Sequence, residues 1–123
     1  MTRYFTKDHE WIDVEGDEGT VGITDYAQGQ LGDITFVELP ADGRALTKGE
    51  TACMVDSVKA AADAYAPVGG TVTGSNAALA DAPELVNSAP EAEGWLYRMS
   101  ISDPAEIGEL MDEAAYKDYV AGL

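Results

Sequence analysis

The sequence has few positively charged residues. Among its 123 residues are 7 lysines and arginines against 23 aspartates and glutamates, which gives a formal net charge of −16. Nucleic acids and anionic membranes are bound by clustered Lys and Arg side chains. We therefore expect neither a nucleic acid nor a membrane as a partner. An acidic surface suits a soluble protein, and it equally suits a protein that docks on basic faces of other proteins.

Cysteine and histidine are nearly absent, with one residue of each, Cys53 and His9. A lone cysteine forms no internal disulfide, and this pair cannot build a closed zinc site, so no metal site is predicted. Cys53 lies in the apolar run "ETACMV" without a basic neighbour, which predicts a buried structural thiol rather than a nucleophile. His9, close to Trp11, is interpreted as a packed or hydrogen-bonded side chain. No catalytic residue is predicted.

Long hydrophobic runs are missing too. No apolar stretch is long enough to cross a bilayer, and the N-terminal "MTRYFTKDHEW" lacks the apolar segment of a secretory signal. We therefore expect a cytoplasmic, prokaryotic protein. The length fits one compact domain, and residues 1–123 are predicted to form it.

Several short segments alternate between apolar and polar residues, as half-buried strands do. They are "EWIDVE" (10–15), "TVGIT" (20–24), "ITFVELP" (34–40) and "GWLYRMSIS" (94–102). In the last of these, Trp95, Tyr97, Met99 and Ile101 share the face that we expect in the core. Helical patterns follow Thr24 and, near the C-terminus, the candidate N-cap Asp103. The pattern predicts a mainly β sandwich or barrel with short helices, including a C-terminal helical segment.

One of the four lysines, Lys59, stands in an unusual setting. Two short extended runs, "TACMVD" and "AAADAYAP", flank "SVKA", which predicts a hairpin with Lys59 at its tip. The Ser57 hydroxyl suits such a turn because it can bond nearby backbone, and the alanines leave the amine accessible to another protein. These residues by themselves leave open whether Lys59 is a functional amine or an ordinary turn lysine.

Six stretches in this order and spacing resemble the glycine cleavage system H proteins, which are lipoyl carriers. They are "HEWI" (9–12), "GITDYAQGQLGDI" (22–34), "FVELP" (36–40), "SVKA" (57–60), "PELVN" (83–87) and "EGWL" (93–96). The resemblance runs from Tyr4 to about Tyr119. It implies a lipoyl/biotinyl-carrier-like fold, a flattened β sandwich (barrel-sandwich hybrid), in which Gly69 and Gly70 let the chain turn closely after the hairpin.

The resemblance also implies what the chain does. Lys59 would carry (R)-lipoic acid in amide linkage, and the chain would be a non-catalytic shuttle of glycine catabolism and one-carbon metabolism. It would take an aminomethyl group from glycine decarboxylase (P protein) to aminomethyltransferase (T protein), and dihydrolipoamide dehydrogenase (L protein) would reoxidise it. A lipoyl/octanoyl transferase or a lipoate ligase would attach the group. The residues implied in recognition by that enzyme are Asp56, where the family usually has Glu, with Ser57, Val58 and Ala60.

By the same resemblance, Glu10 and Asp63 lie in the cleft that receives the loaded arm, where their carboxylates would meet its amine. Gln30 stands near this cleft at a position where the family sometimes has His. Two other functions stay open: a lipoyl-group donor or relay carrier, and a lipoyl domain of a 2-oxoacid dehydrogenase complex. A biotin carrier fits less well, because its lysine usually lies between two methionines and Lys59 lies between Val58 and Ala60.

Overall fold

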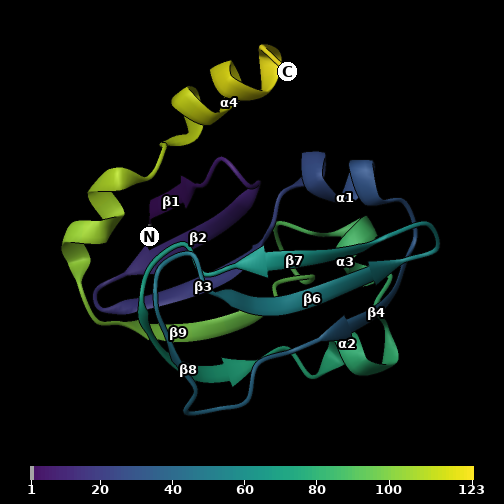
Figure 1. Ribbon diagram of the computed structural model, residues 1–123, viewed down its shortest axis with the longest axis horizontal. Coiled ribbons are helices and arrows are strands. Elements are labelled where there is room, and N and C mark those ends of the chain that lie inside the picture. Colours follow the sequence, from purple (N-terminus) through teal and green to yellow (C-terminus); the bar gives the residue numbers. More distant parts are fainter. Residues whose placement is uncertain (1) are drawn as a thin grey trace.

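The structure, a computed structural model, describes residues 2–123, in which two antiparallel sheets enclose the main apolar core (Figure 1). The larger sheet has, in spatial order, β1 (Thr2–Phe5), β2 (Glu10–Glu15), β3 (Glu18–Ile23), β9 (Tyr97–Ile101), β8 (Gly70–Ser75) and β5 (Ala45–Leu46). The smaller sheet has β4 (Ile34–Glu38), β6 (Thr51–Ser57) and β7 (Ala61–Tyr65). The mainly β flattened sandwich implied by the resemblance is confirmed.

The alternation in β9 places its side chains as the sequence predicts, with one exception. Tyr97, Met99 and Ile101 are buried, whereas Arg98 is exposed. The prediction for Trp95 was wrong. Trp95 precedes the strand and is only half-buried, and the Arg98 guanidinium lies 4.3 Å from the centre of its ring. Alternation orders side chains only where the backbone runs in the ladder, and the ladder begins at Tyr97.

Short helices close the ends of the sandwich. α1 (Asp25–Leu31) starts where the sequence predicts, because the Thr24 hydroxyl accepts a hydrogen bond from the Ala27 amide at 3.2 Å. It ends at Gly32, whose φ of 81° suits glycine. Two helical turns that connect β8 to β9 are α2 (Ala78–Asp81) and α3 (Leu85–Ser88).

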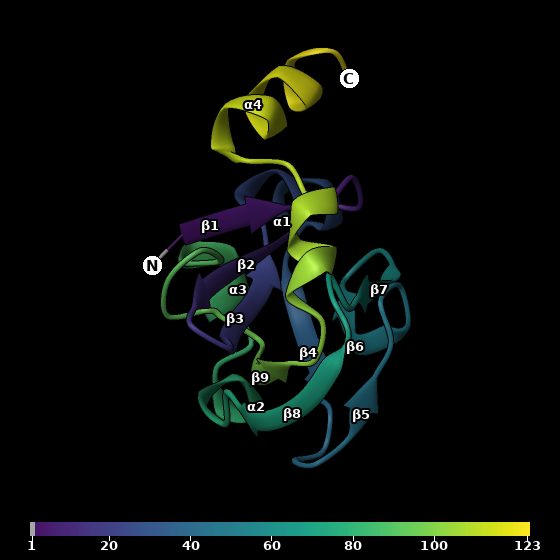
Figure 2. The same cartoon turned by 90° about the vertical axis from the view of Figure 1, so that its left-hand side faces the viewer.

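The C-terminal segment divides into two helices. Asp103 caps the first as predicted, but this is a 3-10 helix, η1 (Pro104–Glu109). Asp112 then caps α4 (Glu113–Ala121), which stands out from the sheets (Figure 2). A second apolar cluster anchors α4, in which the rings of Phe5 and Tyr116 stack with centroids 4.5 Å apart. None of the helices described in residues 2–123 is long and apolar enough to span a membrane.

Gly69 and Gly70 do not provide the glycine-specific turn that the resemblance implied. Neither has a left-handed φ; the glycines that do are Gly16, Gly32, Gly43 and Gly49. Gly70 is instead pressed against β9, where a Cβ would lie 1.9 Å from the Ser100 carbonyl oxygen. The expectation of a turn that only glycine permits was therefore wrong. Close approach of two strands is what requires glycine at position 70.

Candidate functional site

The β6–β7 hairpin presents Lys59 at a turn that Ser57 holds in place. The Ser57 amide donates to the Ala60 carbonyl at 2.7 Å, and the Ser57 hydroxyl donates to the same oxygen at 3.1 Å. That hydroxyl also accepts from the amides of Lys59 and Ala60, at 3.3 and 3.1 Å. Lys59 itself is exposed. The hairpin predicted from "SVKA" is present, and its turn is fixed by local hydrogen bonds.

A second contact fixes the hairpin relative to α1. The Val58 amide donates to the Asp33 carbonyl at 3.0 Å, just beyond the end of α1. The Lys59 stem lies over Gly32, where an added Cβ would come 3.5 Å from Lys59 Cε. The amine-bearing side chain is therefore held between the hairpin tip and the C-terminal end of α1.

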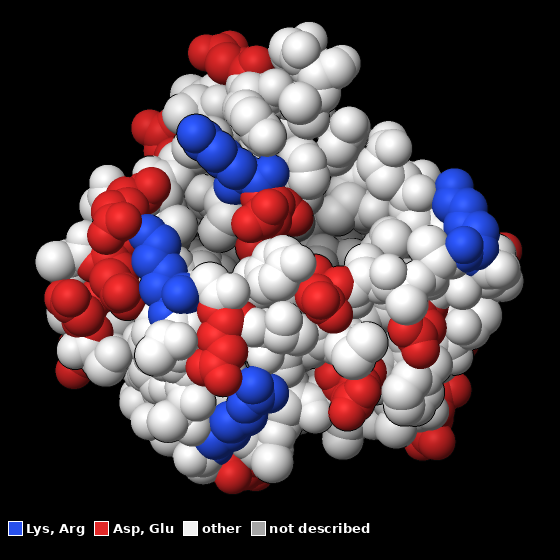
Figure 3. Space-filling model, viewed as in Figure 1, with Lys and Arg blue, Asp and Glu red and all other residues white. Residues whose placement is uncertain are grey.

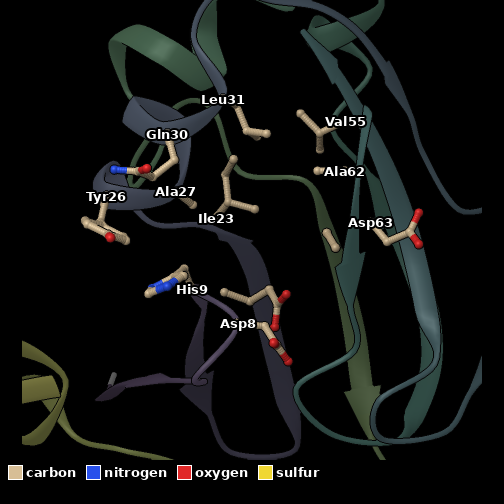
Figure 4. A pocket seen from close by; sticks show the side chains of 12 residues that line it. Asp8, His9, Ile23, Tyr26, Ala27, Gln30, Leu31, Val55, Ala62 and Asp63 are labelled. Atoms are coloured by element: carbon tan, nitrogen blue, oxygen red, sulfur yellow. The ribbon is translucent and has the colours of Figure 1, made fainter. Parts of the chain in front are cut away.

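A cavity of about 290 Å³ lies between α1 and the inner face of the hairpin. Leu31, Val55 and Ala62 line one end of it, and Asp8 and His9 line the other (Figure 4). The Lys59 turn is next to the apolar end, since β6 and β7 lead from Val55 and Ala62 to the turn. A flexible chain attached at Lys59 could thus lie along apolar walls and bring its end to polar groups.

Glu10 is the most buried acidic side chain of the cavity, with 2% of its surface exposed. Its two carboxylate oxygens accept from the Thr6 hydroxyl at 2.6 Å and the Tyr65 amide at 3.2 Å. Among residues 2–123 it has no salt bridge to a lysine or arginine. Burial raises the pKa of Glu10 to about 7, against the effect of these hydrogen bonds. A cation that enters the cavity would therefore find a carboxylate without a counter-ion.

Two neighbours of Glu10 complete this end of the cavity. Asp8 is exposed at the rim, and its charge helps to raise the pKa of Glu10. His9 has a left-handed φ of 69°, and its Nδ1 lies 2.8 Å from the Tyr116 hydroxyl of α4. Burial lowers the pKa of His9, which favours a neutral, hydrogen-bonded ring. The sequence reasoning missed Asp8, although its place two residues before Glu10 was a usable signal.

Asp63 lies at the cavity, as the resemblance implied, but its side chain is oriented differently from Glu10. It borders the cavity, but it is exposed and its carboxylate points away from the cavity (Figure 4). Strand alternation is the reason, because Ala62 and Ala64 on either side of Asp63 face inward. Glu10 and Asp8 are thus brought together in the cavity, whereas the carboxylate of Asp63 is on the other face of β7. Gln30, on α1, lines the cavity as expected.

Comparison with known proteins gives one consistent result. The family model described as "Glycine cleavage H-protein" matches residues 3–122. The chain belongs to the glycine cleavage H-protein family. A glycine cleavage system H protein of Beijerinckia indica is 58% identical over 123 residues, covering 100% of this chain and 98% of that protein. One of Paramagnetospirillum magneticum is 54% identical over 122 residues, covering 99% and 98%.

A solved structure agrees with these sequence relatives. The crystal structure of a glycine cleavage system H protein from Mycobacterium marinum superposes with a TM-score of 0.88 and 37% identity, covering 99% of this chain and 98% of that one. As a glycine cleavage H-protein, the chain is a carrier component of the glycine cleavage system, the lipoyl shuttle expected from the sequence. This function is favoured over a general lipoyl donor and over a lipoyl domain of a 2-oxoacid dehydrogenase.

The surroundings of Cys53 indicate a structural thiol. The thiol is buried on β6, and burial raises its pKa to about 12. A thiol with that pKa is almost entirely protonated at neutral pH and is a poor nucleophile. The structural role predicted for Cys53 is consistent with both observations.

Proposed function

We propose that Lys59 carries (R)-lipoic acid in amide linkage and that the cavity beside it shelters the aminomethyl cargo between enzymes. One observation carries the proposal: an exposed lysine on a fixed turn stands beside a cavity with apolar walls and a buried carboxylate. When attached, the lipoyl group supplies a dithiol–disulfide pair that accepts the cargo and two electrons. The residues that would hold it are Lys59, through the amide, and the apolar walls Leu31, Val55 and Ala62.

Glu10 has a specific task in this proposal. The cargo ends in a primary amine, which is stable toward loss only while its lone pair carries a proton. A carboxylate in a site of low polarity stabilises the protonated amine, and the walls keep bulk water away. Asp8, at the rim, adds negative charge to the same end of the cavity. We assign Glu10 as the principal partner of the ammonium, and Asp63 acts from a greater distance.

The hairpin around Lys59 is the part of the chain that the attaching enzyme would recognise. Ser57 and Ala60 shape the turn, and Asp56 and Val58 flank the lysine, so these four residues are proposed as the recognition site of the lipoyl/octanoyl transferase or lipoate ligase. Glycine decarboxylase, aminomethyltransferase and dihydrolipoamide dehydrogenase are the proposed partners of the modified chain. They supply all the catalysis, and the chain supplies none. The cytoplasmic location and the single domain over residues 1–123 stay predictions.

The test of this function is a single substitution at the attachment site. In Lys59→Arg the charge is kept, but guanidinium stays protonated and is not acylated. We expect wild-type protein from its own host, grown with lipoate, to have the mass of the chain plus one lipoyl group, and Lys59→Arg to have the bare mass. Glycine cleavage reconstituted with the partner enzymes should proceed with the wild-type chain and fail with Lys59→Arg. A bare mass for the wild type under these conditions contradicts the proposal.

The role of Glu10 is tested by the lifetime of the loaded cargo. We expect Glu10→Gln to release ammonia and formaldehyde roughly tenfold faster than wild type, since one pKa unit on the amine is a factor of ten in its unprotonated fraction. Glu10→Ala should behave alike, whereas Asp63→Asn and Asp63→Ala should change release by less than Glu10→Gln. Release from both Glu10 variants at the wild-type rate would remove Glu10 from this role.

A further inference from the structure

The three-stranded sheet has an inner face on the core and an outer face toward solvent. Because strand residues alternate, the neighbours of buried Val37, Val55 and Ala64 point outward. We call this surface the outer face; its strand residues are Phe36, Glu38, Met54, Asp56, Ala61 and Asp63, and Val58 adjoins them in the turn after β6. The ladder sets Phe36 opposite Asp56, and Met54 lies between Glu38 and Asp63 on the two flanking strands.

The outer face is unusually apolar for a solvent-exposed sheet. Phe36 is 56% exposed, Met54 39% and Val58 69%. Elsewhere in residues 2–123 the large hydrophobic side chain with comparable exposure is Leu123, 62% exposed at the C-terminus. Strands β6 and β7 lie toward the viewer in Figure 1, and within residues 2–123 no helix lies in front of them there. Gathered apolar side chains of this kind mark interaction surfaces.

The charged side chains within the three strands are all acidic, and Arg44, which lines a pocket with Glu38 and Met54, is paired with Glu50. Strands β4, β6 and β7 contain Glu38, Asp56 and Asp63 and no lysine or arginine. Figure 3 shows scattered red side chains on this face, blue at the edge where the β6–β7 turn lies, and further blue side chains elsewhere in the view. A partner that fits has an apolar patch bordered by Lys and Arg, because like charges across an interface repel.

The distance from Lys59 indicates which partner this is. The enzyme that acylates Lys59 must reach the amine itself, whose five single bonds from Cα span only roughly 6 Å. That enzyme must therefore contact the hairpin turn, from which the outer face continues along β6 and β7. Enzymes that act on the finished arm reach it across a long acyl chain. The outer face also lies on the opposite side of β6 and β7 from the cavity, so it stays open whatever the cavity holds.

We propose that the outer face is the docking surface for the enzyme that attaches the acyl group, through an apolar patch with a basic border. On docking, Lys59 Nζ attacks the activated acyl carbon and forms the amide, the leaving group of the thioester or acyl phosphate departs with its bonding electrons, and the amine gives up a proton. The inference rests on the proposed function of Lys59. It extends the recognition site from the four residues of the turn to Phe36, Met54, Glu38 and Asp63.

The first test uses two substitutions outside the turn, Phe36→Ser with Met54→Ser. The full chain without lipoyl group is incubated with the attaching enzyme of the same host and an activated octanoyl donor, and the gain in intact mass gives the rates. We expect kcat/KM for the chain to fall roughly 10- to 100-fold, mainly through KM, because apolar anchors at interfaces cost that much when truncated. The single variant Phe36→Leu, which keeps an apolar side chain at this position, should retain much of the wild-type rate of acyl attachment.

Leu123→Ser is the matched control, since it removes an equally exposed apolar side chain far from the hairpin, and its rate should equal that of the wild type. Circular dichroism confirms that each variant is folded. If the wild type gains no mass, the proposed function of Lys59 fails. If the wild type and the Phe36→Ser, Met54→Ser chain gain mass at equal rates, only the docking inference fails. Normal attachment with slow glycine cleavage would assign the face to another enzyme and also overturn the inference.

The second test addresses the charges. Glu38→Gln with Asp63→Asn removes two acids from the outer face, and we expect a lower kcat/KM at low salt and a weaker dependence on salt, as for charges at the edge of an interface. Glu15→Gln with Asp118→Asn changes the net charge equally, but on β2 and α4, and should leave the salt dependence near that of the wild type. If kcat/KM depends equally on salt in both double variants, the inference that the partner has a basic border is wrong.

Discussion

Glu10 shows how one residue combines stability and function. Its carboxylate is buried without a counter-ion, and burial raises its pKa to about 7 from an ordinary value of 4.5. Such a group is usually unfavourable when ionised, because desolvation is not repaid by a charge partner. A carrier that must hold an ammonium reversibly can retain it, since the missing partner is the cargo. The same side chain therefore predicts a pH dependence of folding.

We expect the unliganded chain to lose stability as pH rises through the window between about 4.5 and 7. The folded state binds the Glu10 proton more tightly than the unfolded state, so the contribution is present below 4.5 and is lost above 7. Urea unfolding at about pH 5 and about pH 8 should show wild type losing roughly 3 kcal/mol relative to Glu10→Gln. A constant difference between the two chains at both pH values would contradict it.

Asp63 shows where inference at the residue scale stops. Its separation of four residues from Lys59 and the family match both suggested the cavity. Asp63 does border the cavity, but its carboxylate points outward, because Ala62 and Ala64 occupy the inward positions of β7. Asp8 is the opposite case: the sequence reasoning passed over it, yet the loop before β2 brings it to the cavity rim beside Glu10.

At the scale of elements, local signals predicted most of the strands and the caps. Alternation identified β2, β3, β4 and β9, two short extended runs predicted β6 and β7, and candidate caps marked the starts of α1 and η1. The sequence reasoning did not identify β1, β5 and α2. β5 has only two residues and α2 only four, which is too short for a period to be recognised.

Strand β8 provides a matched pair of glycines for a test. Gly70 packs against the β9 backbone, with its hypothetical Cβ 1.9 Å from the Ser100 oxygen, whereas nothing lies within 4 Å of a Cβ at Gly74. We expect Gly70→Ala to lower the free energy of unfolding by about 3 kcal/mol or more, since backbone must move. Gly74→Ala should be neutral or slightly stabilising, because it reduces the entropy of the unfolded chain. Denaturant midpoints compare the two, and equal losses would contradict the close-approach argument.

At the scale of the whole molecule, the net charge of −16 opposes the compact state through self-repulsion. The five salt bridges described within residues 2–123 involve Arg3, Arg44, Lys48 and Lys117, each paired with a nearby acid. Lys59 is not among these cations. Acylation of Lys59 would remove one more positive charge without breaking any of those pairs.

Salt screens the repulsion between the acidic side chains, and its effect on the stability of the fold is measurable. We expect the thermal midpoint of unfolding to rise by a few degrees between about 10 mM and about 200 mM sodium chloride, because the Debye length shortens and repulsion between acids weakens more than the few close pairs. Differential scanning calorimetry at constant pH checks this. A falling midpoint would mean that the attractive pairs outweigh the repulsion.

The sequence by itself determined the class of fold, the turn at Lys59, the family and the exclusion of a disulfide. These depend on local periodicity, on the hydrogen bonding of Ser57 and on ordered motifs, all of which lie within short segments. Tertiary structure decided which carboxylate enters the cavity, why Gly70 is a glycine and which apolar side chains remain uncovered. Those properties depend on strand register and on how two sheets meet, and the contacts involved join residues far apart in the chain.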